Sequence, residues 1–350
     1  MLVTGGAGFI GANFVHYWRN KYPDDQVIIL DALTYAGNKD NLKFYLDQEN
    51  VVFINGSICD QMLVKKIFIS HKIDKVVHFA AESHVDRSIE GPDDFINTNI
   101  MGTYVLLKTA QANWSHRGVN DHLFHHVSTD EVYGSLELAE PPFSETSAYA
   151  PNSPYSASKA ASDHLVRSYH HTYGLNTTTS NCSNNYGAFQ YPEKLIPLCL
   201  INILQGRPLP IYGDGKQIRD WLHVDDHCRG IDLVLGNGTY GETYNIGGDN
   251  ERKNIDVVKL ICKTVNEIFA HEPDLHALFP DSPCSRNRDS AELITYVEDR
   301  LGHDFRYAVN ANKIKTELGF SASVTFDSGI KNTIKWYLDN QDWWLPLLDK

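Results

Sequence analysis

The chain has 350 residues, of which 42% are hydrophobic and 21% are charged. This is the composition of a folded globular protein, and the length suits one large domain with a lobe or two packed domains. The formal net charge of -13 excludes broad binding to nucleic acid or to acidic membranes, because both require positive protein surface.

The cysteine and histidine patterns narrow the class of protein further. No two of the six cysteines form a CxxC pair, so they are expected to be reduced thiols. The sixteen histidines have no HExxH or Cys/His framework around them, so no metal is expected. No apolar run approaches the roughly 20 residues that span a bilayer, and the chain begins with the strand-like "MLVTGG". We therefore expect a cytoplasmic protein that does not insert into membranes.

Short apolar runs alternate with amphipathic stretches through the first 130 residues. Strands are expected at 1–5, 26–30, 51–54, 75–81 and 123–129. Helices are expected from about Ala12, Asp60 and Asp93. Continuous apolar strands are typical of a parallel sheet covered by helices on both faces. The pattern predicts an α/β fold with a Rossmann-type, doubly wound parallel sheet.

The second half begins regularly and then changes character. A helix is expected from Ser153 to Tyr173, and a strand and loop over 176–187. Beyond this point proline, glycine and charged residues interrupt the pattern, and no repeat or low-complexity linker separates the parts. We expect a Rossmann domain over 1–185, completed by sheet elements from about 220–250, and a smaller, tightly packed C-terminal lobe over 186–350.

The stretch "TGGAGFIG" lies between the first strand and the first helix and spaces Gly5, Gly8 and Gly11 as GxxGxxG. Glycines there allow a tight turn and let the backbone approach a pyrophosphate at the helix N-terminus. Asp31 ends the next strand 20 residues after Gly11, where a carboxylate can bind a ribose diol. The combination predicts a dinucleotide site, and Asp31 favours NAD over NADP because a 2′-phosphate would meet its negative charge.

Thr129, Asp130 and Glu131 stand where the strand at 123–129 ends, within "STDEVYG". Open parallel sheets bind ligands at this edge. Two adjacent carboxylates that are partly removed from water can split their pKa values into an acid and a base. A solvated loop with ordinary acids is the alternative interpretation.

Tyr155 and Lys159 are one helical turn apart in "YSASK", so their side chains leave the same face of the expected helix. By itself this spacing is also that of an ordinary surface pair. With NAD bound nearby, Lys159 and the positive nicotinamide would favour the phenolate of Tyr155, which could then act as a general base. Lys159 would also bind the nicotinamide ribose.

Together Thr129, Tyr155 and Lys159 resemble the catalytic set of the extended short-chain dehydrogenase/reductases, and the resemblance covers residues 1 to about 340. Within that superfamily the chain resembles the dTDP-glucose 4,6-dehydratase family, and the Asp130–Glu131 pair distinguishes it from epimerases and decarboxylases. The motifs that carry the resemblance are "TGGAGFIG", "DALTYAGN", "FAAESHVDRSI", "STDEVYG", "YSASKA", "NNYG", "PEKLIPL", "PIYGDGKQIRDWLHVDDH", "GETYNIGG" and "RYAVNANKI".

The resemblance implies an internal redox cycle on dTDP-glucose that regenerates NAD at each turnover. Tyr155, aided by Thr129, takes the proton of the carbon 4 hydroxyl during its oxidation. Glu131 then removes the carbon 5 proton, Asp130 protonates the hydroxyl leaving carbon 6, and hydride returns to carbon 6. The product is dTDP-4-keto-6-deoxyglucose, and the C-terminal lobe is expected to bind the sugar nucleotide.

The resemblance and the glycine-rich turn also assign binding residues. The residues assigned to NAD are Gly5, Gly8, Phe9, Ile10, Gly11, Asp31, Leu33, Thr34, Ser57, Ile58, Phe79, Ala80, Ala81, Ser83, Thr98, Tyr155, Lys159 and Asn185. Those assigned to the substrate are Ser83, His84, Thr129, Asp130, Glu131, Asn184, Lys194, Leu195, Pro210, Ile211, Tyr212, Arg219, Asn245, Asp299, Arg300 and His303. Arg219 is expected to hold the diphosphate with its planar guanidinium, and its alternative is a surface arginine beside Asp220.

Two positions depart from the family pattern. Ser57 stands where an aspartate usually faces the adenine, which leaves a hydroxyl for the exocyclic amine. Leu301 stands where proline is usual, so the loop that carries His303 loses a rigid φ angle.

Other interpretations stay open at this point. One is a different sugar-nucleotide dehydratase or a decarboxylase of the same superfamily, and another is a non-catalytic NAD-binding protein. The resemblance also implies a homodimer in which the helices over about 93–113 and 153–173 pair as a four-helix bundle, with Val105, Leu106, Leu165 and Val166 as apolar residues. A core role within one subunit is the alternative for these four residues.

Overall fold

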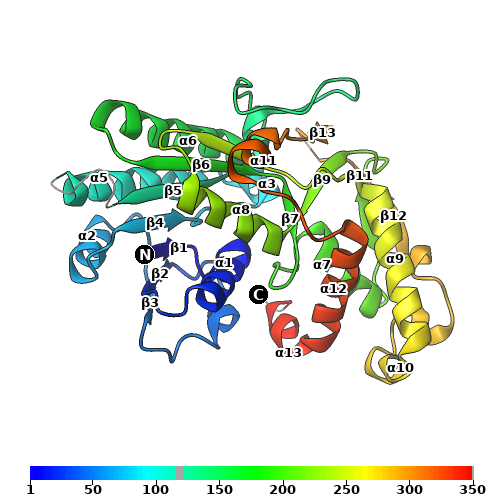
Figure 1. Ribbon diagram of the computed structural model, residues 1–350. Coiled ribbons are helices and arrows are strands. Elements are labelled where there is room, and N and C mark those ends of the chain that lie inside the picture. The colour runs from blue at the N-terminus through cyan, green and yellow to red at the C-terminus, as the bar shows by residue number, and fades with distance from the viewer. Residues whose placement is uncertain (116–121, 301, 349–350) are drawn as a thin grey trace.

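The computed structural model describes residues 1–115, 122–300 and 302–348. At its centre lies a seven-stranded sheet in the order β10-β6-β5-β4-β1-β2-β3, in which every neighbouring pair is parallel (Figure 1). The strands are β1 (Leu2–Thr4), β2 (Val27–Asp31), β3 (Val51–Asn55), β4 (Lys75–His78), β5 (Leu123–Thr129), β6 (Thr177–Cys182) and β10 (Thr243–Ile246). This confirms the predicted α/β fold with a doubly wound parallel sheet.

Helices cover both faces of this sheet. On one face α1 (Phe9–Lys21) packs against α8 (Val224–Asn237), and on the other lie α2 (Gln61–Ser70), α5 (Thr103–Trp114) and α6 (Pro154–Tyr173) (Figure 1). Successive strand residues point to opposite faces, so Val27 and Ile29 join the first core while Ile28 and Leu30 join the second. Both faces are buried, which is why these strands have no polar alternation.

The first helix begins earlier than expected. We expected its start at about Ala12, but α1 begins at Phe9, immediately after Gly8. Gly8 has extended dihedral angles and precedes the first helical residue, so the N-terminus of α1 faces the glycine-rich turn directly.

The C-terminal lobe has a hydrophobic core of its own, in which every buried residue lies between Tyr186 and Trp344. Its main helices are α7 (Leu195–Leu204), α9 (Asn254–His271) and α12 (Phe326–Asp339), with shorter α10 (Asp274–Leu278) and α13 (Gln341–Trp344). The short α11 (Asn312–Leu318) instead packs with α8 and β10 at the central sheet. The strands of the lobe form two small sheets, β8 (Leu209–Tyr212) with β12 (Ile294–Val297), and β9 (Ile218–His223) with β7 (Asn184–Tyr186), β11 (Glu251–Lys253) and β13 (Arg306–Tyr307). This separate core supports the division near residue 185, which stays a prediction.

The stretch before α5 is built from short helical pieces. They are α3 (Val85–Glu90), α4 (Asp93–Phe95) and a π-helical segment over Ile96–Gly102 that runs into α5. Val105, Leu106 and Val166 are all buried inside the chain, in the core beneath α5 and α6. The expectation that these three residues face a partner subunit is therefore wrong, and of the four only Leu165 is partly exposed.

Two broader features accompany this fold. None of the helices in the described ranges is both long enough and apolar enough to cross a membrane. All six cysteines are free thiols, and only Cys59 is exposed.

Candidate functional site

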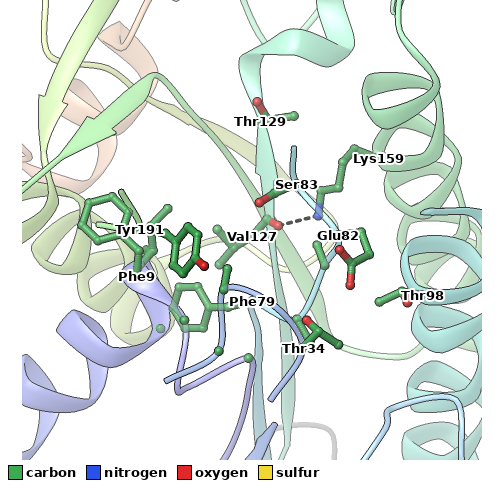
Figure 2. Close-up of a pocket in the computed structure, with 18 of the residues that line it drawn as sticks. Phe9, Thr34, Phe79, Glu82, Ser83, Thr98, Val127, Thr129, Lys159 and Tyr191 are labelled. Carbon is green, nitrogen blue, oxygen red and sulfur yellow. Dashed lines mark hydrogen bonds between the residues drawn. The ribbon is translucent and has the colours of Figure 1, made fainter. Parts of the chain in front are cut away.

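A cavity of about 370 Å³ opens at the carboxyl ends of the central strands. Its walls come from the turns after β1, β2, β3 and β4, from the π-helical segment before α5, from the end of β5, from α6 and from the segment between β6 and α7. In the view of Figure 2, Phe9, Phe79 and Tyr191 lie on one side of this cavity, and Thr34, Glu82 and Thr98 on the other. This is the edge at which open parallel sheets bind ligands.

The glycine-rich turn forms one wall of the cavity with backbone atoms that no side chain covers. Gly5 has a φ of +69°, and a Cβ there would lie 2.6 Å from the Ala80 nitrogen. A Cβ on Gly11 would lie 2.2 Å from the Gly5 carbonyl oxygen. The turn therefore needs glycine at both positions, and it presents backbone and the α1 N-terminus to the cavity, which fits a dinucleotide pyrophosphate.

Asp31 ends β2 and is almost fully buried at the cavity wall. One carboxylate oxygen accepts from the Ala7 amide at 2.9 Å, and the other accepts from the Leu33 amide at 2.8 Å. Burial raises the pKa of Asp31, and these two backbone donors lower it. Asp31 therefore fixes the glycine-rich turn as well as facing the cavity. Leu33, which we assigned to NAD, contributes a backbone amide here, and its partly buried side chain packs against the core and is not among the cavity-lining residues.

Thr129, Asp130 and Glu131 all line the cavity where β5 passes into a 3-10 turn over Asp130–Tyr133. The Thr129 hydroxyl accepts from the Glu131 amide at 3.3 Å and donates to Asp130 Oδ1 at 3.4 Å. The other Asp130 oxygen is buried without a hydrogen-bond partner among the described residues. Such an oxygen is costly to bury unless a ligand or a proton satisfies it.

The two carboxyl groups have different electrostatic surroundings. The pKa of Asp130 is raised well above its usual value by burial, then by the charges of Glu131 and Asp220. Burial also raises the pKa of Glu131, but Arg300, Arg219 and Lys194 all lower it. Asp130 is thereby suited to donate a proton and Glu131 to accept one, which is the split expected of an acid and a base that share a site.

Tyr155 and Lys159 lie on one face of α6 and line the cavity. Burial raises the pKa of Tyr155 well above its usual value, and Glu131 raises it further. The Lys159 amine donates to the Val127 carbonyl at 2.9 Å, as Figure 2 shows, and burial lowers its pKa. The activation of Tyr155 by Lys159 with NAD bound stays a prediction.

Most of the expected binding residues meet at this cavity. It gathers all five residues expected to be catalytic and every residue assigned to NAD except Leu33. Ser57 lines it and accepts from the Cys59 amide with its hydroxyl at 3.1 Å. Of the residues assigned to the substrate, it gathers Ser83, Thr129, Asp130, Glu131, Asn184 and Lys194.

The other residues assigned to the substrate do not line this cavity. His84 caps α3 and lies 3.5 Å from Glu193, and Leu195 opens α7. Pro210, Ile211 and Tyr212 form β8, which pairs with β12. Asp299 follows β12, and its carboxylate lies 2.6 Å from His303 Nδ1. Leu301 lies outside the described residues.

The two arginines assigned to the substrate have different surroundings. The Arg219 guanidinium is buried, lies 4.2 Å from the centre of the Tyr307 ring, and donates to the carbonyls of Ile218, Asp304 and Phe305. The alternative of a surface arginine is wrong. Arg300 has a buried Nε without a hydrogen-bond partner in the described structure, and both arginines act on the pKa of Glu131.

Asn245 binds other residues of the protein interior and does not line the cavity. It is fully buried on β10, its amide donates to the Phe143 carbonyl at 3.1 Å, and its side-chain oxygen accepts from the Tyr133 hydroxyl at 2.9 Å. The structure therefore does not support the substrate contact that we assigned to Asn245, because both of its polar groups are used in packing.

The cavity also contains residues that the sequence analysis did not single out. Tyr35, Glu82, Tyr191 and Glu193 all line it. Tyr35, Glu82 and Glu193 each stand beside an expected residue in the chain and Tyr191 stands three residues before Lys194, but their types carry no signal for binding on their own. Only the fold brings the three segments that carry them together.

Comparison with known proteins identifies clear relatives. A family model described as GDP-mannose 4,6 dehydratase matches residues 2–333. A dTDP-glucose 4,6-dehydratase of Escherichia coli is 51% identical over 360 residues, which cover 100% of this chain and 96% of that protein.

Solved structures that resemble this chain include proteins of the same name. The crystal structure of DesIV, a dTDP-glucose 4,6-dehydratase from Streptomyces venezuelae with NAD and TYD bound, is 44% identical with a TM-score of 0.87 and covers 99% of both chains. The dTDP-glucose 4,6-dehydratase of Bacillus anthracis in complex with NAD is 43% identical with a TM-score of 0.85, and the match covers 99% of this chain and 98% of that one.

Proposed function

This chain belongs to the dTDP-glucose 4,6-dehydratase family, and from that membership we infer its reaction. The protein is an NAD-dependent hydro-lyase that converts dTDP-glucose into dTDP-4-keto-6-deoxyglucose. The observation that carries this inference within the chain is the pairing of Asp130 and Glu131 beside Thr129 and Tyr155, in the same cavity as the glycine-rich turn. Oxidation alone needs only Thr129, Tyr155 and Lys159, whereas loss of water needs an acid and a base as well.

The proposed division of labour follows from the surroundings of each side chain. When bound, NAD supplies the hydride acceptor for carbon 4, the hydride that returns to carbon 6, and a positively charged nicotinamide ring. Tyr155 accepts the proton of the carbon 4 hydroxyl, and Thr129 orients that oxygen. Glu131, whose negative charge the nearby cations favour, removes the carbon 5 proton. Asp130, whose high pKa keeps it protonated, gives its proton to the hydroxyl leaving carbon 6.

Positive groups near this acid–base pair support a binding site for the diphosphate of the substrate. Arg219 and Arg300 both lower the pKa of Glu131, and the free Nε of Arg300 is an unused donor. Asn184 has a buried side-chain oxygen without a partner among the described residues, and it lines the cavity. We assign the diphosphate to the two arginines and the sugar to the cavity next to Glu131.

The direct test is mass spectrometry of the sugar nucleotide after incubation with the pure protein. We expect dTDP-glucose to lose the mass of one water, while UDP-glucose in a parallel incubation reacts far more slowly. Preferential reaction of UDP-glucose would identify a different sugar-nucleotide dehydratase. Loss of carbon dioxide from a sugar nucleotide that carries a carboxylate, tested in a third incubation, would identify a decarboxylase. No mass change in any of the three would leave a non-catalytic NAD-binding protein.

Asp31 is proposed to select NAD over NADP. Replacing Asp31 by Ala removes a ribose acceptor and a charge that repels a 2′-phosphate, so we expect NAD binding to weaken about tenfold or more and the preference over NADP to narrow. Binding of both cofactors can be measured by titration calorimetry, with the exposed Asp24→Ala as control. Unchanged NAD affinity would mean that Asp31 does not bind the ribose.

We propose that the protein is a homodimer formed through α5, α6 and the π-helical segment before α5. The exposed face of this region carries Ala157, Leu165 and Met101, and Met101 is 48% exposed. Apolar residues on adjacent exposed helices are typical of an interface between subunits. The cytoplasmic location expected from the sequence stays a prediction.

Light scattering at micromolar concentration should give a mass about twice 39.5 kDa. Leu165→Arg should shift this mass toward that of the monomer, because it places a charge in the apolar contact. Leu278→Arg, at a 51% exposed leucine on α10, should leave it unchanged. A monomeric mass for the unmodified protein would exclude the dimer.

A further inference from the structure

Three segments that are far apart in the sequence meet at the cavity where it borders the expected NAD site. The first is the loop after β2, which carries Tyr35, and the second is the stretch from Glu82 into α3, which carries Arg87. The third is the loop before α7, which carries Tyr191 and Glu193. Sequence motifs do not explain why these residues should touch one another.

Side-chain contacts connect all three segments. The Arg87 guanidinium lies over the Tyr35 ring, 3.8 Å from its centre, and the Tyr191 ring meets Tyr35 edge-on at 5.7 Å. A Glu193 oxygen lies 3.9 Å from the Arg87 guanidinium and 3.5 Å from the His84 ring. Tyr35 is therefore covered by a cation on one side and bordered by a second aromatic ring on another.

Tyr35, Tyr191 and Glu193 line the cavity, whereas Arg87 is exposed and contacts Tyr35 from outside it. The Tyr35 ring lines the cavity, and burial together with the charges of Glu193 and Glu82 raises the pKa of its hydroxyl. The Lys194 amine donates to the Ser83 carbonyl at 3.2 Å, which adds a second link between the second and third segments. These contacts therefore border the part of the cavity that contains Ser83, which is assigned to NAD.

We propose that Arg87, Tyr35 and Glu193 form a clasp that retains the dinucleotide through the redox cycle. This inference rests on the proposed function, because only an enzyme that takes back its own hydride needs the reduced cofactor to stay until the second transfer. Loss of NADH between the two transfers would strand an oxidised sugar in the site. The three residues are positioning residues, since they act by keeping the cofactor in place and take no part in proton transfer.

The clasp is testable without turnover, by exchange of bound cofactor. Protein loaded with radiolabelled NAD is diluted into excess unlabelled NAD, and the label retained on a filter is followed with time. We expect Arg87→Gln to release the label about tenfold faster than the unmodified protein, because both the cation over Tyr35 and the pair with Glu193 are lost. Arg87→Lys keeps the charge but not the planar contact, so its rate should lie between the two.

The matched control is Arg207→Gln, which removes an exposed arginine outside the cavity. Tyr35→Leu should accelerate release to a similar extent as Arg87→Gln, and the double variant should release little faster than either single variant, since all three lose the same contact. A purely structural role would lower the melting temperature of Arg87→Gln and leave its exchange rate equal to that of the control, and this result would overturn the proposal.

A second measurement detects escape of the reduced cofactor during turnover. Lactate dehydrogenase and pyruvate are added with dTDP-glucose, so each NADH that reaches solution is oxidised while one pyruvate is reduced to lactate. The unmodified protein should yield almost no lactate per dehydrated sugar, and Arg87→Gln clearly more. Equal lactate from both proteins would contradict the clasp. Absence of dehydrated sugar with the unmodified protein would instead contradict the proposed function, and the exchange experiment would still judge the clasp.

Discussion

Replacing Glu131 by Gln should lower turnover by about two orders of magnitude or more while leaving the first oxidation intact. The amide keeps the shape of the side chain, but it cannot accept the proton from carbon 5. Tyr155, Thr129 and Lys159 are unchanged, so the reaction should stop after hydride transfer from carbon 4. On addition of dTDP-glucose, absorbance at the NADH band should rise and persist, and the mass of the sugar should show no loss of water.

The matched control for this experiment is Glu137→Gln, at an exposed glutamate six residues further along the chain. It should dehydrate dTDP-glucose at the normal rate. Two results would refute the assigned role of Glu131. One is near-normal dehydration by Glu131→Gln, and the other is a complete failure to reduce NAD although substrate still binds.

The pH dependence of the unmodified protein gives a related check. Glu131 works as a base only when it is ionised, and its pKa is raised by burial. The rate of water loss should therefore fall on acidification at a higher pH than the ordinary pKa of a glutamate would give. The rate of water loss and the rate of the first oxidation, the latter followed by absorbance, are each measured against pH. The fall of the rate on acidification should appear only in water loss, because only that step uses Glu131.

Replacing Tyr155 by Phe should have an equally large effect at an earlier step. The ring is kept and only the hydroxyl is lost, so the buried side chain still packs, but no group remains to take the proton from the carbon 4 hydroxyl. A positioned acid or base typically contributes about 10²–10⁴-fold, and we expect the rate of NAD reduction itself to fall by that factor. In contrast with Glu131→Gln, little NADH should appear in the absorbance measurement.

Tyr173→Phe provides the comparison, since Tyr173 ends the same helix and is 57% exposed. Its rates should match those of the unmodified protein. If Tyr155→Phe still reduced NAD at a near-normal rate, the base for the first step would have to be another group. The raised pKa of Tyr155 makes this comparison informative, because the protein surroundings alone favour its neutral phenol.

The central sheet and the expected catalytic residues could be predicted because their signals are local in the sequence. The strand that ends at Asp31 is apolar up to that residue, the strand that ends at Thr129 is buried along its whole length, and the glycine-rich turn follows its strand directly. In a parallel sheet the ends of such strands meet at one edge, so residues that follow them come together without further information. The spacing of Tyr155 and Lys159 on one helix face brings that pair to the same place.

Contacts that depend on side-chain direction could not be predicted in the same way. An apolar residue on a helix predicts a buried face but not whether a sheet or a partner buries it, and Val105, Leu106 and Val166 proved to be buried against the sheet. Asn245 follows a strand pattern that does not reveal which neighbours its amide will find. The contact of Arg87 with Tyr35 joins helix α3 to the loop after β2, and only the tertiary structure fixes their relative positions.

The two hydrogen bonds accepted by Asp31 have a consequence for any attempt to engineer the protein to use NADP. The obvious first change removes the carboxylate, yet that carboxylate also ties the Ala7 amide of the glycine-rich turn to the loop after β2, where it accepts from the Leu33 amide. A variant that tolerates a 2′-phosphate would thus lose part of the support of the glycine-rich turn, which both cofactors share. At position 31, asparagine keeps one acceptor oxygen, and serine keeps one acceptor oxygen on a shorter side chain. Either is therefore a better starting point than alanine for a redesign that must first rebuild the turn.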